Sequence, residues 1–159
     1  MPTKLQFVNQ ARKYIGLPHR HQGRAHLGGK NQAVDCVGLL VCAGEDLGLT
    51  DKNGAAILRT DNLNYGPQPT RNDVHVACEQ RLISKSLGDP IEPGDVITLL
   101  VKYREDEPGV TCHVAIISEL NGHLGMIHSF ASLGRVVEHS LAPKWLRRIE
   151  GIFSVPGLT

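Results

Sequence analysis

Apolar residues recur at helical spacing through the first half of the chain. A capping-box sequence runs from Thr3 to Gln6, and the apolar positions after it predict an amphipathic helix over 3–15. An apolar run beginning at Cys36 predicts a second helix over 36–47, which Gly48 ends. A weaker pattern from Thr70 predicts a third helix that continues to about residue 86.

The second half of the chain changes to short apolar or alternating runs separated by turn residues, as strands require. The expected strands cover 95–101, 111–119, 124–130, 135–139 and 149–155, with a short helical turn over 143–147. Helices followed by strands indicate an α+β fold, with N-terminal helices packed on a mostly antiparallel sheet of five to six strands. We expect a single domain over residues 1–159.

Composition narrows the functional classes. The 17 basic and 16 acidic residues nearly cancel, which argues against nucleic acid as a partner and against an anionic membrane surface. No apolar run is long enough for membrane insertion, and the N-terminus lacks the apolar segment of a signal peptide. The four cysteines are scattered, which fits reduced thiols better than a disulfide framework or a structural zinc knuckle. Without a signal peptide, the protein is expected to be made in the cytoplasm. No cofactor is expected.

The loop-to-helix junction at Asp35 and Cys36 is the first candidate for chemistry. Asp35 is expected at the N-cap, which places Cys36 in the first turn among unpaired backbone N–H groups. The helix dipole there should favour a thiolate, and the same N–H groups could stabilise an oxyanion. The alternative is that Cys36 is a small buried hydrophobic residue, the commoner role of free cysteine.

The second candidate is a pair of histidines on a predicted hairpin. Asn121-Gly122 suits a two-residue type I′ turn, which sets Leu120 opposite His123. His113 and His128 then share one face as diagonal neighbours, roughly 7–8 Å apart at the backbone. With Cys36 they could form a nucleophile, general base and orienting group. The alternative is that each histidine is simply buried and hydrogen-bonded.

The polar loop over 18–33 is rich in cationic and imidazole side chains. We expect it to form a positively charged edge of the active site, although a plain solvated loop is the open alternative. A zinc site is a further alternative, but the spacing lacks the paired ligands of structural zinc, so no metal is predicted. The charged and imidazole side chains of the loop are His19, Arg20, His21, Arg24 and His26. The possible zinc ligands among them are His19, His21 and His26, with Cys36, His113 and His128 as further possible ligands.

Several short motifs, in order along the chain, resemble the NlpC family of papain-like cysteine peptidases that act on bacterial cell walls. They are Asp35-Cys36-x-Gly38-Leu39, Pro93-Gly94-Asp95-Val96, the strand from His113 to Ile116 and Ile127-His128-Ser129. The run from Gly16 to Arg24 is most similar to the phage tail-associated branch. The resemblance covers roughly residues 5–155 and implies a papain-like fold.

The resemblance also implies a reaction and roles for the residues. The expected function is a cysteine endopeptidase that hydrolyses peptidoglycan stem peptides, typically between D-glutamate and a diamino acid. Cys36 would be the nucleophile, His113 the general base and His128 the third member. Carboxylates of the substrate could pair with Arg20, Arg24 or Lys30.

Two positions depart from the family's pattern near the nucleophile. Many members have Tyr where His19 stands and Ser where Val37 stands. Asp35, which helps such members to read a free stem-peptide amine, is present here without that hydroxyl. Together with the cationic side chains named above, these positions give the predicted substrate-binding residues: Asp35, His19, Arg20 and Arg24.

Since murein lies outside the cytoplasmic membrane, a hydrolase without a leader would be carried there in a phage tail, released by lysis, or confined to recycling inside the cell. The similarity of the 16–24 run to the phage branch favours the first, so we expect the protein in a phage or phage-like tail, in contact with tail proteins and acting in the cell wall. Two other functions remain open. One is a cysteine acyltransferase or amidase of the same superfamily, and the other is a catalytically inactive docking protein of tail assembly.

Overall fold

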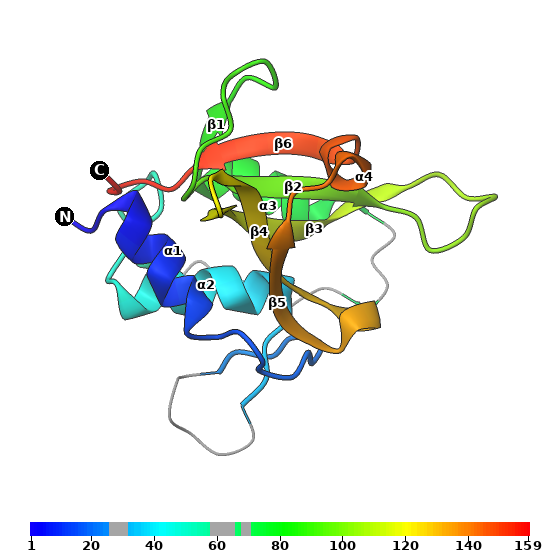
Figure 1. Cartoon of the computed structure of the whole chain (residues 1–159), viewed down its shortest axis with the longest axis horizontal. Coiled ribbons are helices and arrows are strands. Elements are labelled where there is room, and N and C mark those ends of the chain that lie inside the picture. The colour runs from blue at the N-terminus through cyan, green and yellow to red at the C-terminus, as the bar shows by residue number, and fades with distance from the viewer. Residues whose placement is uncertain (26–31, 58–65, 68–70) are drawn as a thin grey trace.

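The computed structural model describes residues 1–25, 32–57, 66–67 and 71–159. Its helices are α1 (Lys4–Arg12), α2 (Cys36–Asp46), α3 (Asp73–Arg81) and α4 (Pro143–Leu146). Its strands are β1 (Ile83–Lys85), β2 (Val96–Val101), β3 (Val110–Leu120), β4 (His123–Phe130), β5 (Arg135–Ser140) and β6 (Ile149–Ser154). Figure 1 shows the two chain termini side by side, where Lys4 donates its backbone N–H to the carbonyl of Thr159.

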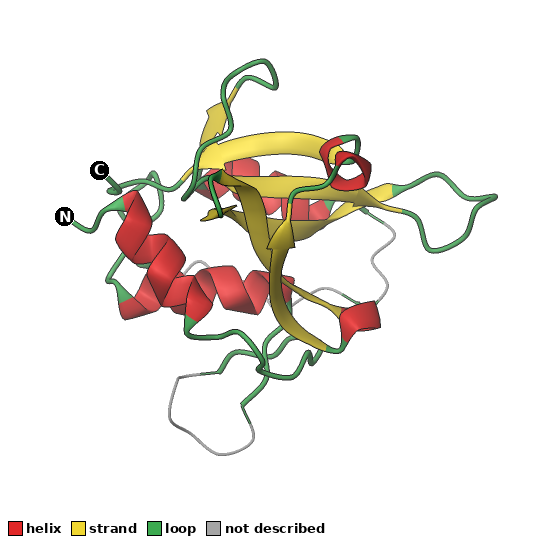
Figure 2. Ribbon diagram, viewed as in Figure 1, coloured by secondary structure: helices red, strands yellow, loops and turns green. Residues whose placement is uncertain are grey.

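The strands form one sheet in the order β1-β6-β2-β3-β4-β5, and every neighbouring pair is antiparallel. The predicted α+β class and the antiparallel sheet are therefore confirmed. Figure 2 shows α1 and α2 lying together against the curved sheet. Among the described residues, no helix combines the length and the apolar character needed to cross a membrane.

The end of the third predicted helix is wrong. The helix stops at Arg81, and Leu82 takes an extended backbone conformation. Residues Ile83–Lys85 then pair with the last strand, with Ile83 opposite Ser154. The spacing of a short apolar run beside a helix does not show whether the run extends the helix or forms a strand. Here the run forms a strand because it pairs with the edge of β6.

The turn between β3 and β4 follows the predicted geometry. Asn121 and Gly122 have φ angles of 51° and 79°, and positive values at both positions define the type I′ turn. Leu120 pairs with His123, and Ile116 pairs with Ile127, as the turn length requires. The register of the hairpin is therefore confirmed.

Two hydrophobic clusters lie on opposite faces of the sheet. The first joins α1, α2 and α3 to one face and includes Phe7, Leu39 and Ile116. The second lies on the other face, where Trp145 of α4 packs with Ile97 and Ile117. Alternation along β3 places the side chain of residue 113 on the face of this second cluster.

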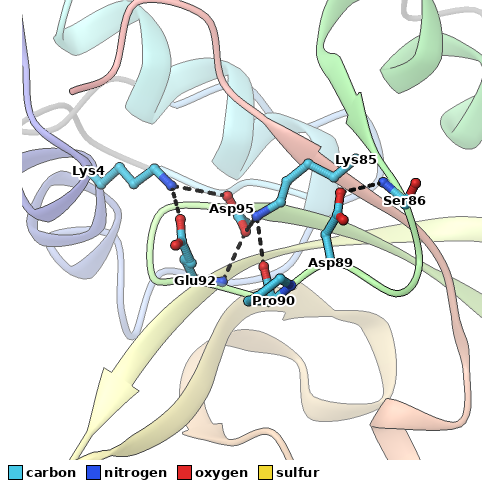
Figure 3. Close-up of polar contacts among 7 residues, drawn as sticks. All are labelled: Lys4, Lys85, Ser86, Asp89, Pro90, Glu92 and Asp95. Carbon is cyan, nitrogen blue, oxygen red and sulfur yellow. Dashed lines mark hydrogen bonds and ion pairs between the residues drawn. The ribbon is translucent and has the colours of Figure 1, made fainter.

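A buried carboxylate anchors the turn that leads into β2 (Figure 3). Asp95 has no exposed surface, and its oxygens lie 2.6 Å from Lys85 Nζ and 3.5 Å from Lys4 Nζ. Its Oδ2 also accepts the backbone N–H of Glu92. Gly94 has a φ of 91°, and a Cβ there would lie 2.7 Å from that of Lys4. The Pro-Gly-Asp motif is therefore explained by packing and charge pairing.

Candidate active site

The start of α2 is built around the carboxylate of Asp35. Asp35 is the N-cap, as predicted, and its Oδ1 accepts the backbone N–H of Gly38 at 2.7 Å. Oδ2 accepts the backbone N–H of Gln22 at 2.9 Å, and Nη1 of Arg24 lies 2.9 Å from Oδ1. The carboxylate thus joins the preceding loop to the helix and fixes the first turn, where Cys36 lies.

Gly38 is required by a close contact with the same loop. A Cβ at this position would lie 2.0 Å from the carbonyl oxygen of Gly23, a separation that no side chain can adopt. Its absence lets the loop backbone lie directly on the first turn of α2. This contact is a physical reason for the glycine two residues after Cys36.

Cys36 begins α2 and lies where β3 and β4 separate. The β3–β4 ladder ends at the Ile116–Ile127 pair, and the backbone N–H of Val114 hydrogen-bonds to the Cys36 thiol. Continued pairing would have directed that N–H toward Ser129 of β4. The sulfur therefore occupies the fork between the two strands, beside the residue that follows His113.

The thiol is not activated in the resting protein. Burial and, after it, the charge of Asp35 raise the pKa of Cys36 to about 12, and the N–H groups of Val114 and Val37 lower it only in part. The prediction that the helix start favours a thiolate is therefore wrong. Burial of the sulfur and a carboxylate one residue away outweigh the hydrogen bonds that the thiol receives from these two N–H groups. The residue itself remains partly exposed.

His113 and His128 meet as the register predicted. Nε2 of His113 lies 2.7 Å from Nδ1 of His128, and both side chains are buried. Burial lowers the pKa of His113 well below its usual value and lowers that of His128 to about 3. Both rings are therefore neutral at neutral pH, and His113 can accept a proton.

A third histidine, absent from the sequence prediction, extends this pair. Nε2 of His139 lies 2.8 Å from Nε2 of His128, and Nδ1 of His139 lies 2.9 Å from the carbonyl oxygen of Ser140. In the β4–β5 ladder His139 is opposite Met126, which makes it a diagonal neighbour of His128. The Trp145 ring contacts both, with centroids 5.3 Å from His128 and 5.7 Å from His139.

The remaining predicted residues lie at different depths in the site. His19 is half-buried, and its Nδ1 lies 2.8 Å from Oγ of Ser129, which donates to the carbonyl of Val34. Burial lowers the pKa of His19, and its charge contributes to the lowered pKa of His113. Arg20 is exposed. The structure thus brings Cys36, His113, His128 and His19 into one region and leaves Arg20 at its surface.

Some predicted positions cannot be placed. His26 and Lys30 lie outside the described residues, as does most of the 50–70 segment. Within the described ranges, no group of three or more His, Cys, Asp or Glu side chains is arranged to hold a metal ion.

Tyr103, in the loop after β2, brings a hydroxyl group to the same region. Its oxygen lies 3.4 Å from Sγ of Cys112. Burial, the contact with Cys112 and the proximity of Cys36 all raise the pKa of Tyr103, which keeps the hydroxyl neutral. This contact is not predictable from the sequence, because the pattern over 102–110 indicates only a polar loop.

Comparisons with known proteins identify the fold. No family model matches the chain, and no curated protein matches it. A Staphylococcus aureus Mu50 structure described as similar to lipoprotein, NLP/P60 family, matches with a TM-score of 0.56 and 19% identity, over 96% of this chain and 41% of that one. NlpC1 from Trichomonas vaginalis matches with a TM-score of 0.51 and 19% identity, over 94% and 42% of the two chains.

The Mycobacterium tuberculosis peptidoglycan hydrolase RipB matches with a TM-score of 0.51 and 16% identity, over 95% of this chain and 63% of that one. The chain therefore spans less than two thirds of the length of each of these three proteins. At such identities the likeness concerns the fold. The chain has the papain-like α+β fold of the NlpC/P60 structures.

Proposed function

We propose that this chain is a cysteine peptidase that hydrolyses an amide bond in peptidoglycan stem peptides, of the D-glutamate–diamino acid type. The observation that carries the proposal is the fork between β3 and β4, where the Cys36 thiol accepts the backbone N–H of Val114, the residue that follows His113, and His113 hydrogen-bonds to buried His128. The shared fold with RipB, described as a peptidoglycan hydrolase, supports the choice of substrate.

The proposed reaction begins with a neutral thiol and a neutral base. His113 takes the thiol proton as Cys36 Sγ attacks the amide carbonyl carbon, and a tetrahedral oxyanion forms. The amine leaves with the proton from His113, which gives a thioester. Water that His113 deprotonates then attacks the thioester, releasing the carboxylic acid and returning the proton to sulfur.

The oxyanion would be stabilised at the start of α2. The first backbone N–H groups of a helix have no partners within the helix, and Asp35 occupies that of Gly38. In the proposed mechanism, the backbone N–H groups of Cys36 and of a neighbouring residue donate hydrogen bonds to the oxyanion.

Substrate carboxylates are the second part of the proposal. Arg20 is exposed and suits an anionic group of the stem peptide, whereas Arg24 already forms an ion pair with Asp35. Delivery in a phage or phage-like tail completes the proposal. It is supported by the similarity of residues 16–24 to the tail-associated branch.

Digestion of purified murein sacculi tests the function directly. Wild-type protein should release fragments with new amine termini, and mass spectrometry of the fragments identifies the bond. Cys36→Ala should abolish release, whereas Cys42→Ala, which removes a buried thiol from the same helix, should retain it. Circular dichroism checks that both variants fold.

Two results would contradict the proposal. Release by Cys36→Ala would exclude this nucleophile, and no release by folded wild-type protein would favour the docking function. New amide products that appear only with an added amine would favour the acyltransferase.

A further inference from the structure

The hydrogen-bond chain that runs from Ser140 to His113 has a fixed direction. Its outer end is a backbone carbonyl, 2.9 Å from Nδ1 of His139, and a carbonyl can only accept. His139 must therefore carry its proton on Nδ1. In the neutral ring, Nε2 is then the unprotonated nitrogen and can only accept.

The donor and acceptor nitrogens of the next two rings, His128 and His113, follow from this assignment. Because Nε2 of His139 accepts, Nε2 of His128 must donate across the 2.8 Å contact. Neutral His128 then accepts at Nδ1, so Nε2 of His113 donates across the 2.7 Å contact. The remaining nitrogen of His113, Nδ1, is left with a lone pair and no proton.

We propose that His139 is a positioning residue that fixes the proton positions of His128 and His113, so that Nδ1 of His113 is the basic nitrogen available to Cys36. The assignment of that nitrogen to proton abstraction rests on the proposed function. The proton order itself depends only on the contacts from Ser140 to His113.

The surroundings hold the three histidine rings in these contacts. His113 and His128 are 3% and 0% exposed, so solvent cannot readily replace their protein partners. Trp145 contacts the rings of both His128 and His139 and restrains their orientation. With the opposite order, Nδ1 of His113 would carry a proton, and a neutral ring in that form could not deprotonate the thiol.

Histidine ring tautomers can be read by ¹⁵N NMR at a pH where the rings are neutral. In wild-type protein, His113 should have an unprotonated Nδ1 and a protonated Nε2. His139→Leu removes the outer acceptor, so His128 and His113 should become tautomer mixtures with a detectable Nδ1–H on His113. His139→Glu supplies only an acceptor and should restore the wild-type tautomers.

His123→Leu is the matched control, because it replaces an exposed histidine at the turn end of β4, and it should change neither ring. In murein digestion, His139→Leu should lower kcat by about tenfold or more with little change in KM, because general-base catalysis contributes about 10²–10⁴-fold. His139→Glu should recover most of that loss.

A protonated Nδ1 on His113 in the wild-type spectrum would overturn the proposal, even if no variant folded. Unchanged tautomers in folded His139→Leu would also overturn it. The spectra do not depend on catalytic turnover, so failure of the proposed function can be distinguished from failure of the proposed proton order. In that case the tautomers would respond to His139 as described, while wild-type protein released nothing from murein.

Discussion

Nη1 of Arg24 lies 2.9 Å from Oδ1 of Asp35, and the side chains are only 12% and 5% exposed. Removing one member of a buried pair leaves an uncompensated charge, which costs about 3–5 kcal/mol. Asp35→Ala also removes the helix cap, worth about 1 kcal/mol. We therefore expect Asp35→Ala to lower the free energy of unfolding strongly, as measured by urea denaturation.

The exposed pair at the start of α3 provides a control for this effect. Arg71 Nη2 lies 3.1 Å from Asp73 Oδ1, with side chains 79% and 45% exposed. Arg71→Ala should change the free energy of unfolding by about 0–1 kcal/mol, whereas Arg24→Ala should cost more. Equal losses for the two arginine variants would show that burial does not strengthen the Arg24–Asp35 pair.

Stability should fall as the pH becomes mildly acidic. Burial lowers the folded-state pKa of His113 and His128, that of His128 to about 3, whereas unfolded histidine titrates near ~6.5. Their contribution to stability is complete above the unfolded pKa and is lost below it, because the unfolded chain binds protons first. Between its unfolded and its folded pKa, each histidine should lower the free energy of unfolding by up to about 1.4 kcal/mol per pH unit.

Urea denaturation at a series of pH values below the unfolded histidine pKa tests whether the free energy of unfolding falls on acidification. The loss of stability should be smaller in His128→Asn than in wild-type protein, and His123→Asn should retain the wild-type slope. A wild-type stability that rises on acidification would contradict the lowered pKa values.

Alkylation of Cys36 should report its raised pKa. Because burial and Asp35 hold that pKa at about 12, the thiolate fraction should rise about tenfold per pH unit through the neutral and mildly alkaline range. Iodoacetamide labelling, followed by mass spectrometry of the peptide that contains Cys36, measures this rate. A rate that is already constant at mildly acidic pH would instead indicate a preformed thiolate–imidazolium pair.

The buried Asp95 should depend more on Lys85 than on Lys4. Lys85 Nζ lies 2.6 Å from Oδ2, whereas Lys4 Nζ lies 3.5 Å from Oδ1 and also pairs with Glu92. Lys85→Met should therefore destabilise by about 3–5 kcal/mol, as expected for a buried carboxylate that loses its partner. Lys4→Met should cost less in the same thermal or urea unfolding experiment, and the reverse order would contradict this account.

The hairpin could be predicted from sequence because its determinants are local. Two residues with positive φ, Asn121 and Gly122, fix the pairing, and the pairing fixes which side chains share a face. The meeting of His113 and His128 follows from that register. The N-cap role of Asp35 is local in the same sense.

The features that the sequence did not reveal depend on contacts between distant segments. His139 joins the site through the β4–β5 register, and the 131–134 connection carried no turn signal as strong as Asn-Gly. The pKa of Cys36 depends on how deeply the fold buries the sulfur and on the charge of Asp35. The sequence pattern predicts that residues 83–85 continue the preceding helix, because their partner in the sheet, β6, lies about seventy residues further along the chain.

The outermost acceptor of the histidine chain belongs to the main chain, at Ser140. A mutation at position 140 exchanges the side chain but leaves the carbonyl oxygen in place. The identity of residue 140 can therefore drift widely, provided that the edge strand keeps its path. Insertions or prolines that bend this strand would disturb the buried imidazoles more than most point substitutions at its surface.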